Sequence, residues 1–64
     1  MYLGFNMTLR EAKRLQPGDE VYWNDPDETC SRYVTIRYIR INGDIISIDT
    51  QDGSEIECFA HELS

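Results

Sequence analysis

A β-rich segment whose alternation changes phase at its middle is the feature that most constrains the fold of this chain. Residues 32–41 are rich in β-branched and aromatic side chains, which strands favour. Val34 and Ile36 alternate in one phase, whereas Ile39 and Ile41 alternate in the other. A β-bulge near Arg37–Tyr38 would restore one continuous inner face, and a bulge bends a strand strongly. The segment therefore predicts a long, bent strand of the kind that a small closed barrel requires.

The residues after this strand predict two further strands joined by tight turns. Asn42-Gly43 is a strong signal for a two-residue hairpin loop. It predicts a third strand over residues 44–50, with Ile46 and Ile48 in phase. Residues 51–53, Gln-Asp-Gly, predict the next tight turn. A fourth strand over residues 54–59 then turns Ile56 and Cys58 one way and Glu55, Glu57 and Phe59 the other.

An earlier strand and an acidic loop precede the bent strand. Alternation over residues 19–24 places Val21 and Trp23 on one face and Tyr22 on the other. Residues 24–29 are dense in turn formers, because Asn and Asp close local turns and proline fixes its own φ. The strands follow one another through short connections, so we expect an antiparallel meander.

The N-terminal part predicts a short helix. Thr8 and Glu11 have the spacing of a capping box, in which each side chain accepts from the other residue's amide. Leu9, Ala12 and Leu15 fall on one helical face, and residues 17–18, Pro-Gly, would stop the helix. The first six residues show no clear period, and residues 1–7 are interpreted either as a flexible segment or as one that pairs with a sheet edge.

The C-terminal residues predict a closing element rather than a helix. Residues 60–63 suit a single 3₁₀ turn whose Leu63 folds back as a plug. No fifth strand is evident after Leu63. We therefore expect the first residues, or the segment over residues 8–15, to protect the open sheet edge.

Size and charge restrict the class of protein. Sixty-four residues form one domain, residues 1–64, and a domain of this size buries only about 60% of the surface that its unfolded chain exposes. The net charge of −6 argues against a general binder of phosphate backbones. Two cysteines cannot build a disulfide-dense framework. With no stretch long and apolar enough for a membrane span, we expect a cytoplasmic protein with free thiols.

The order of these parts resembles a known small fold. It consists of a strand with Val21 and Trp23, an acidic loop, a bent strand, a hairpin, a last strand and a turn that ends in Leu63. This order is similar to the Src-homology-3-like (SH3-like) small β-barrel, in its Tudor-like and KOW-like branch. The resemblance covers residues 18–63. It implies a mainly β fold, a small SH3-like antiparallel barrel of four to five strands with a short N-terminal helix.

The resemblance also implies where a partner binds. In similar modules, peptides or methylated side chains lie against aromatic residues of the first strand, the loop after it and the neighbouring strands. Trp23 matches the first-strand aromatic residue and Tyr33 a second one. Tyr22, Tyr38 and Phe59 match less closely. Asp25 and Asp27 lie beside Trp23 in the sequence. Carboxylates and ring faces both attract cations, so this surface suits a cationic segment.

Several of these residues also have a structural interpretation. Trp23 would serve equally as a core residue whose indole N–H finds one acceptor at the rim. Cys58 and His61 are spaced so that they could meet as metal ligands or as a nucleophile with its base. However, the inward phase of Cys58 favours a small buried hydrophobe. We expect no metal, no cofactor and no enzyme, because one histidine and no phosphate loop leave nothing to position a substrate.

The sequence therefore predicts a non-catalytic interaction module that binds a protein segment at an aromatic and acidic surface. Two alternatives stand beside it. Arg32, Arg37 and Arg40 would form a basic strip for a nucleic-acid-associated accessory protein, provided that they share one face. Otherwise the aromatic surface would be the interface of a structural dimer, so both a monomer and a homodimer are compatible with the sequence.

Overall fold

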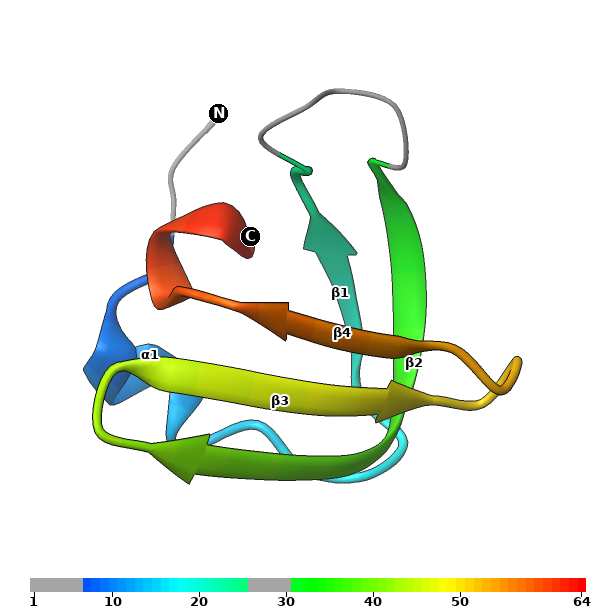
Figure 1. Ribbon diagram of the computed structural model, residues 1–64, viewed down its shortest axis with the longest axis horizontal. Helices are drawn as coiled ribbons and strands as arrows, with labels where there is room; N and C mark the ends of the chain where they lie inside the picture. Colours follow the sequence, from blue (N-terminus) through cyan, green and yellow to red (C-terminus); the bar gives the residue numbers. More distant parts are fainter. Residues whose placement is uncertain (1–6, 26–30) are drawn as a thin grey trace.

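The fold is a curled antiparallel sheet of four strands. The computed structural model describes residues 7–25 and 31–64. The strands are β1 (Glu20–Trp23), β2 (Arg32–Asn42), β3 (Ile45–Thr50) and β4 (Glu55–Cys58), and they lie in the order β1-β2-β3-β4. Figure 1 shows the sheet curling into a half-barrel. The predicted mainly β meander is confirmed.

Strand β2 bends at the predicted place and so belongs to both halves of the sheet. Its first half pairs with β1, with Val21 opposite Val34. Its second half pairs with β3, and the register shifts between Ile36 and Tyr38. The predicted bulge near Arg37–Tyr38 is thus confirmed. The shift keeps Ile36 buried and turns Ile39 towards the same core, as the change of phase requires.

The hairpin between β2 and β3 turns one residue later than predicted. Asn42 pairs with Ile45, so the loop is Gly43–Asp44 rather than Asn42–Gly43. Gly43 has a φ of 64°, the left-handed region that glycine adopts without strain. The observed register sets Ile41 opposite Ile46, whereas the predicted loop would have set Asp44 opposite Ile41. Pairing of apolar side chains across the strands therefore decides the turn.

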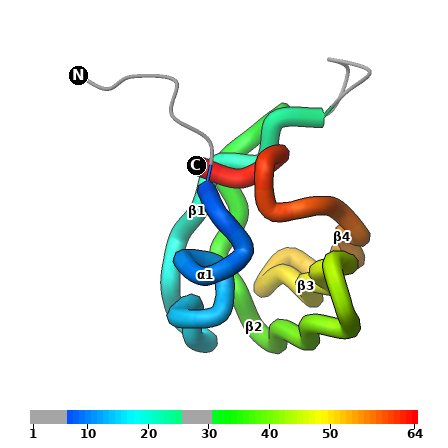
Figure 2. Tube along the Cα trace, turned by 90° about the vertical axis from the view of Figure 1, so that its left-hand side faces the viewer, coloured from blue at the N-terminus to red at the C-terminus, as the bar shows by residue number. Residues whose placement is uncertain are grey.

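The first described element is one helical turn, α1 (Leu9–Ala12). The capping box is formed as expected: the Glu11 N–H donates to Thr8 Oγ1 at 3.1 Å, and the Thr8 N–H donates to Glu11 Oε1 at 2.8 Å. The helix ends well before Pro17. The N–H groups of Arg14 and Leu15 bond to carbonyl oxygens three residues back, the tighter pattern of a 3₁₀ turn. Figure 2 shows α1 in front of the curled sheet, with β1 and β4 on opposite sides of it.

The last residues of the chain protect the open edge of β1, which corrects our expectation. After the 3₁₀ turn η1 (Ala60–Glu62), Ser64 exchanges two backbone hydrogen bonds with Tyr22, of 2.9 and 3.0 Å. The Asn24 N–H donates to the Glu62 carbonyl at 2.7 Å. Residues 8–15 do not pair with this edge. Met7 lies on the far side of the C-terminal residues, where its N–H donates to the Leu63 carbonyl at 2.7 Å, and residues 1–6 lie outside the described part.

The core fills the inside of the curl. Leu63 is fully buried, which confirms its predicted role as a plug. The inward phases predicted for β3 and β4 are also confirmed, because every second side chain of each strand is buried. In β1, Val21 is buried, whereas Trp23 in the same phase is only partly buried. The buried apolar residues are Ala12, Val21, Val34, Ile36, Ile46, Ile48, Ile56, Cys58 and Leu63.

Candidate ligand-binding surfaces

Trp23 lies at the rim of the core and is only partly buried. Its indole Nε1–H donates to Glu62 Oε1 at 3.3 Å. The guanidinium carbon of Arg32 lies 5.9 Å from the centre of its ring. The indole therefore has the single rim acceptor that the core interpretation expected, and a cation of the same chain already lies over the ring.

Tyr22 and Tyr33 form a pair on the other face of β1 and β2. They lie directly opposite each other in the register. Their ring centres are 5.0 Å apart and the rings are inclined by 71°, the edge-to-face arrangement that aromatic rings favour. Tyr33 remains 68% exposed. Because alternation turns Trp23 away from this face, Trp23 and Tyr33 do not form one continuous aromatic wall.

The acidic residues of the predicted site are only partly described. Asp25 follows β1, and its backbone N–H donates to Ser31 Oγ at 2.9 Å. This hydrogen bond joins the two described ends of the loop. Asp27 lies outside the described residues.

A second aromatic and acidic surface lies on the outer face of β2, β3 and β4. The register sets Tyr38 opposite Asp49 and Asp49 opposite Glu55. Phe59 continues the outward phase of β4, as predicted, and it is 44% exposed, while Tyr38 is 56% exposed. We name this surface the acidic face; its members are Tyr38, Arg40, Ser47, Asp49, Glu55, Glu57 and Phe59, none of them buried.

Arg40 and Glu55 form an ion pair within the acidic face. The Arg40 Nη2 and Glu55 Oε2 atoms are 3.7 Å apart, and both side chains are about two-thirds exposed. An ion pair with this exposure contributes little to stability. It neutralises one of the three carboxylates of the face, so the face keeps a net negative charge.

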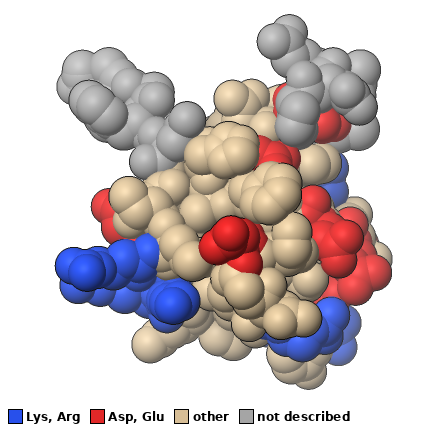
Figure 3. All heavy atoms as spheres, turned by 60° about the vertical axis from the view of Figure 1, so that its left-hand side comes forward, with Lys and Arg blue, Asp and Glu red and all other residues tan. Residues whose placement is uncertain are grey.

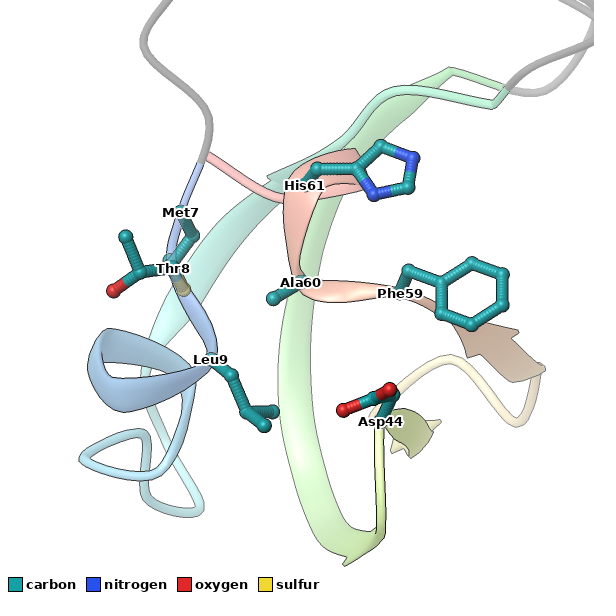
Figure 4. A pocket seen from close by; sticks show the side chains of 7 residues that line it. All are labelled: Met7, Thr8, Leu9, Asp44, Phe59, Ala60 and His61. Atoms are coloured by element: carbon teal, nitrogen blue, oxygen red, sulfur yellow. The ribbon is translucent and has the colours of Figure 1, made fainter.

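A hollow opens beside Phe59, where α1, the β2–β3 turn and η1 meet. It has a volume of about 430 Å³. Figure 4 shows Leu9 and Asp44 pointing toward one another from opposite sides of it, with Phe59 and His61 at its other wall. The Phe59 and His61 rings are stacked, 5.7 Å apart and inclined by only 9°. We name it the Phe59 hollow; its lining residues are Met7, Thr8, Leu9, Asp44, Phe59, Ala60 and His61.

A second hollow lies at the Tyr38 end of the acidic face. It also has a volume of about 430 Å³, and it is lined by residues of β2 and of the β3–β4 hairpin. The Arg37 guanidinium carbon is 5.5 Å from the centre of the Tyr38 ring. Arg37, Asp49 and Glu55 place both signs of charge around this hollow. It is therefore a more polar site than the Phe59 hollow, with one ring already in contact with a cation.

The three arginines of the predicted basic strip lie in different settings. Arg32 lies over Trp23, Arg37 lies over Tyr38, and Arg40 pairs with Glu55. Arg32 follows the inward phase of β2 before the bulge, whereas Arg40 follows the outward phase after it. The condition that they share one face is not met.

Cys58 and His61 lie in different settings, because Cys58 is buried whereas His61 is exposed and stacks on Phe59. Cys58 is a buried free thiol, and burial, with a smaller effect from the Glu62 charge, raises its pKa to about 12. A thiol with so high a pKa is a poor nucleophile at neutral pH. Among residues 7–25 and 31–64, no three His, Cys, Asp or Glu side chains come together as metal ligands.

Sequence reasoning assigned none of the carboxylates of the acidic face to a binding surface; these are Asp49, Glu55 and Glu57. It also did not place Asp44 at a binding surface, although Gly-Asp is itself an acceptable hairpin loop. Leu9 and His61 line the Phe59 hollow, and they come together through contacts between segments far apart in the sequence.

No helix in the described residues is long and apolar enough to cross a membrane. Comparison with protein-family models, with curated proteins and with solved structures finds no match.

Proposed function

We propose that this chain is a small SH3-like barrel that acts as a non-catalytic interaction module, binding a protein segment that carries positive charge. The fold assignment is supported by the meander, the bulge in β2 and the 3₁₀ turn that follows β4. It is further supported by the backbone pairing of Ser64 with Tyr22, which takes the place of a short fifth strand.

The observation that carries the function is the composition of the acidic face. The sheet register gathers Asp49, Glu55 and Glu57 between two exposed aromatic rings, those of Tyr38 and Phe59. Carboxylates attract lysine and arginine by charge, and ring faces attract the same cations through their quadrupole. With a net charge of −6, the whole chain also steers cationic partners towards it.

Binding at this face is expected to be modest and sensitive to salt. Each exposed ion pair contributes only about 0 to 1 kcal/mol. Screening at physiological ionic strength acts over about 8 Å, so added salt weakens each of these contacts. Such a surface suits a transient partner, held by several weak contacts, better than a permanent one.

The partner face can be identified by NMR. Amide shifts of the full chain would be followed while a lysine-rich peptide is added at low salt, and a glutamate-rich peptide of equal length serves as the control. We expect shifts at residues 45–49 and 55–61, which fade as salt is added. Shifts confined to Tyr22, Tyr33 and their neighbours would show that the peptide binds at the Tyr22–Tyr33 pair instead of the acidic face. Absence of any shift would refute the proposed function.

A further inference from the structure

The Phe59 hollow has the composition of a site for one long side chain. Its wall on the α1 side is formed by Met7 and Leu9, and Ala60 lies opposite. Apolar atoms dominate its surface. A concave, mostly apolar hollow with a small number of polar groups is the usual form of a ligand site.

One carboxylate, that of Asp44, lies at the edge of this apolar hollow. Asp44 is exposed, and within the described residues it makes neither a hydrogen bond nor an ion pair. Its side chain points into the hollow in Figure 4. Its position follows from the late turn after β2, which leaves Asp44 in the loop. The hollow therefore offers apolar walls with one negative charge.

The stacked rings of Phe59 and His61 complete the wall opposite α1. The two rings lie nearly parallel, and both line the hollow together with Asp44. A cation close to both gains from the carboxylate charge and from the ring.

We infer that the Phe59 hollow binds the side chain of a lysine in the partner segment. Four methylene groups cover the apolar walls, and the ammonium group reaches Asp44 beside the Phe59 ring. Lysine fits better than arginine, because its aliphatic stem is longer and its charge is compact. This inference rests on the proposed function, and it names lysine as the residue of the partner segment that the module recognises.

The charges around the hollow also set the direction of the partner segment. Arg10, Lys13 and Arg14 are exposed on α1 and the turn after it, whereas Glu57 and Glu55 lie on β4. Figure 3, which views the side that carries α1 and η1, shows a mainly uncharged area with acidic atoms near its centre and basic side chains at its lower edges. A cationic segment therefore leaves the hollow along β4, away from α1.

A peptide series tests the inference on the full chain. One position, flanked on both sides by arginines, holds lysine, norleucine or alanine, and affinity is measured by calorimetry. Norleucine keeps the stem and lacks the ammonium group. We expect lysine to bind about fivefold more tightly than norleucine, the size of one partly exposed ion pair. Alanine should bind more weakly still, because it lacks the stem that covers the apolar walls.

Substitutions separate this inference from the proposed function. Asp44→Asn should remove the preference for lysine over norleucine, while Glu20→Gln, an equal charge change on β1, should leave it intact. Phe59→Leu should also reduce the preference, and amide spectra check that each variant is folded. If the peptides bind on the acidic face and Asp44→Asn keeps the preference, the inference is overturned and the proposed function stands. If no peptide binds, both fail.

A second copy of the chain, as an alternative occupant of the Phe59 hollow, would give a different NMR result. If the amides around the hollow shift when the protein alone is concentrated, a second copy of the chain fills the hollow. That result would also overturn the inference.

Discussion

Glu62 accepts a hydrogen bond from the indole N–H of Trp23 at 3.3 Å, across 39 positions of the chain. Its other carboxylate oxygen accepts from the Phe59 N–H at 2.9 Å. Glu62 is almost fully buried, and both of its oxygens are thus used. One carboxylate thus joins the Trp23 indole of β1 to the Phe59 backbone at the end of β4.

Replacing Glu62 by alanine should destabilise the fold substantially. Two N–H donors would lose a charged acceptor, and each such loss costs about 1.5 to 3 kcal/mol. Because Trp23 is only partly buried, water can take the place of the lost acceptor at its indole N–H. We therefore expect a total loss of about 2 kcal/mol in the free energy of unfolding. This loss is measured by urea titration, in which the fluorescence of Trp23 reports unfolding. Glu57→Ala, at an exposed position of β4, should change stability by less than about 0.5 kcal/mol.

Leu63→Ala should be among the most damaging single substitutions. Leu63 is fully buried at the point where the last residues pair with β1, and truncation of a buried leucine costs about 2 to 5 kcal/mol. In a domain of this size, that is a large part of the total stability. Thermal unfolding followed by circular dichroism gives the change in melting temperature. Leu15→Ala, at a partly buried position, should cost clearly less, and equal costs would argue against the plug.

The β3–β4 turn predicts a specific dependence of stability on pH. The Thr50 hydroxyl and the Ser54 N–H both donate to the Asp52 carboxylate, and these bonds lower the pKa of Asp52 from 3.8 to about 2. A pKa that is lower in the folded state stabilises the fold above the unfolded value. That contribution is lost as the pH falls from about 4 through about 2.

The comparison of wild type with Asp52→Asn checks this dependence. The wild type should unfold at a higher urea concentration at pH 7, and the difference should shrink towards zero near pH 2. Glu20→Gln provides the control for a general change in charge. A difference that stays constant from pH 7 to pH 2 would show that Asp52 does not carry the effect.

The buried thiol of Cys58 should resist modification. Its pKa of about 12 leaves almost no thiolate at pH 8, and burial blocks access as well. A disulfide reagent should therefore label Cys58 only after urea is added, as read by mass spectrometry of the peptide over residues 55–64. Rapid labelling of Cys58 in the native protein would contradict its placement in the core.

The parts of the fold that were predictable from the sequence are those that side-chain phase encodes. The change of phase between Ile36 and Ile39 predicted the bulge, and the alternation of Ile56 with Glu57 predicted the inner and outer faces of β4. The pairing of Ser64 with Tyr22 was not predictable in this way. It is made by backbone N–H and C=O groups. Every residue except proline has both groups, so the side chains carry no signal for this pairing.

The candidate site was harder to predict, because it depends on which strands pair and where they turn. Alternation already placed Tyr22 and Trp23 on opposite faces. The sequence over residues 24–31 carries no two-residue hairpin signal that would fix the register of β1 against β2, so the pairing of Tyr22 with Tyr33 could not be derived. A turn displaced by one residue moved Asp44 from a strand into the wall of the Phe59 hollow.

The most direct test of the central claim is the affinity of a lysine-rich peptide for two matched variants at low salt. Glu57→Gln removes a carboxylate from the acidic face, and Glu20→Gln removes one from β1. Our proposal predicts that Glu57→Gln weakens binding about threefold, in line with one exposed ion pair, while Glu20→Gln leaves it unchanged. Equal affinities for the two variants would contradict the assignment of the binding surface to the acidic face.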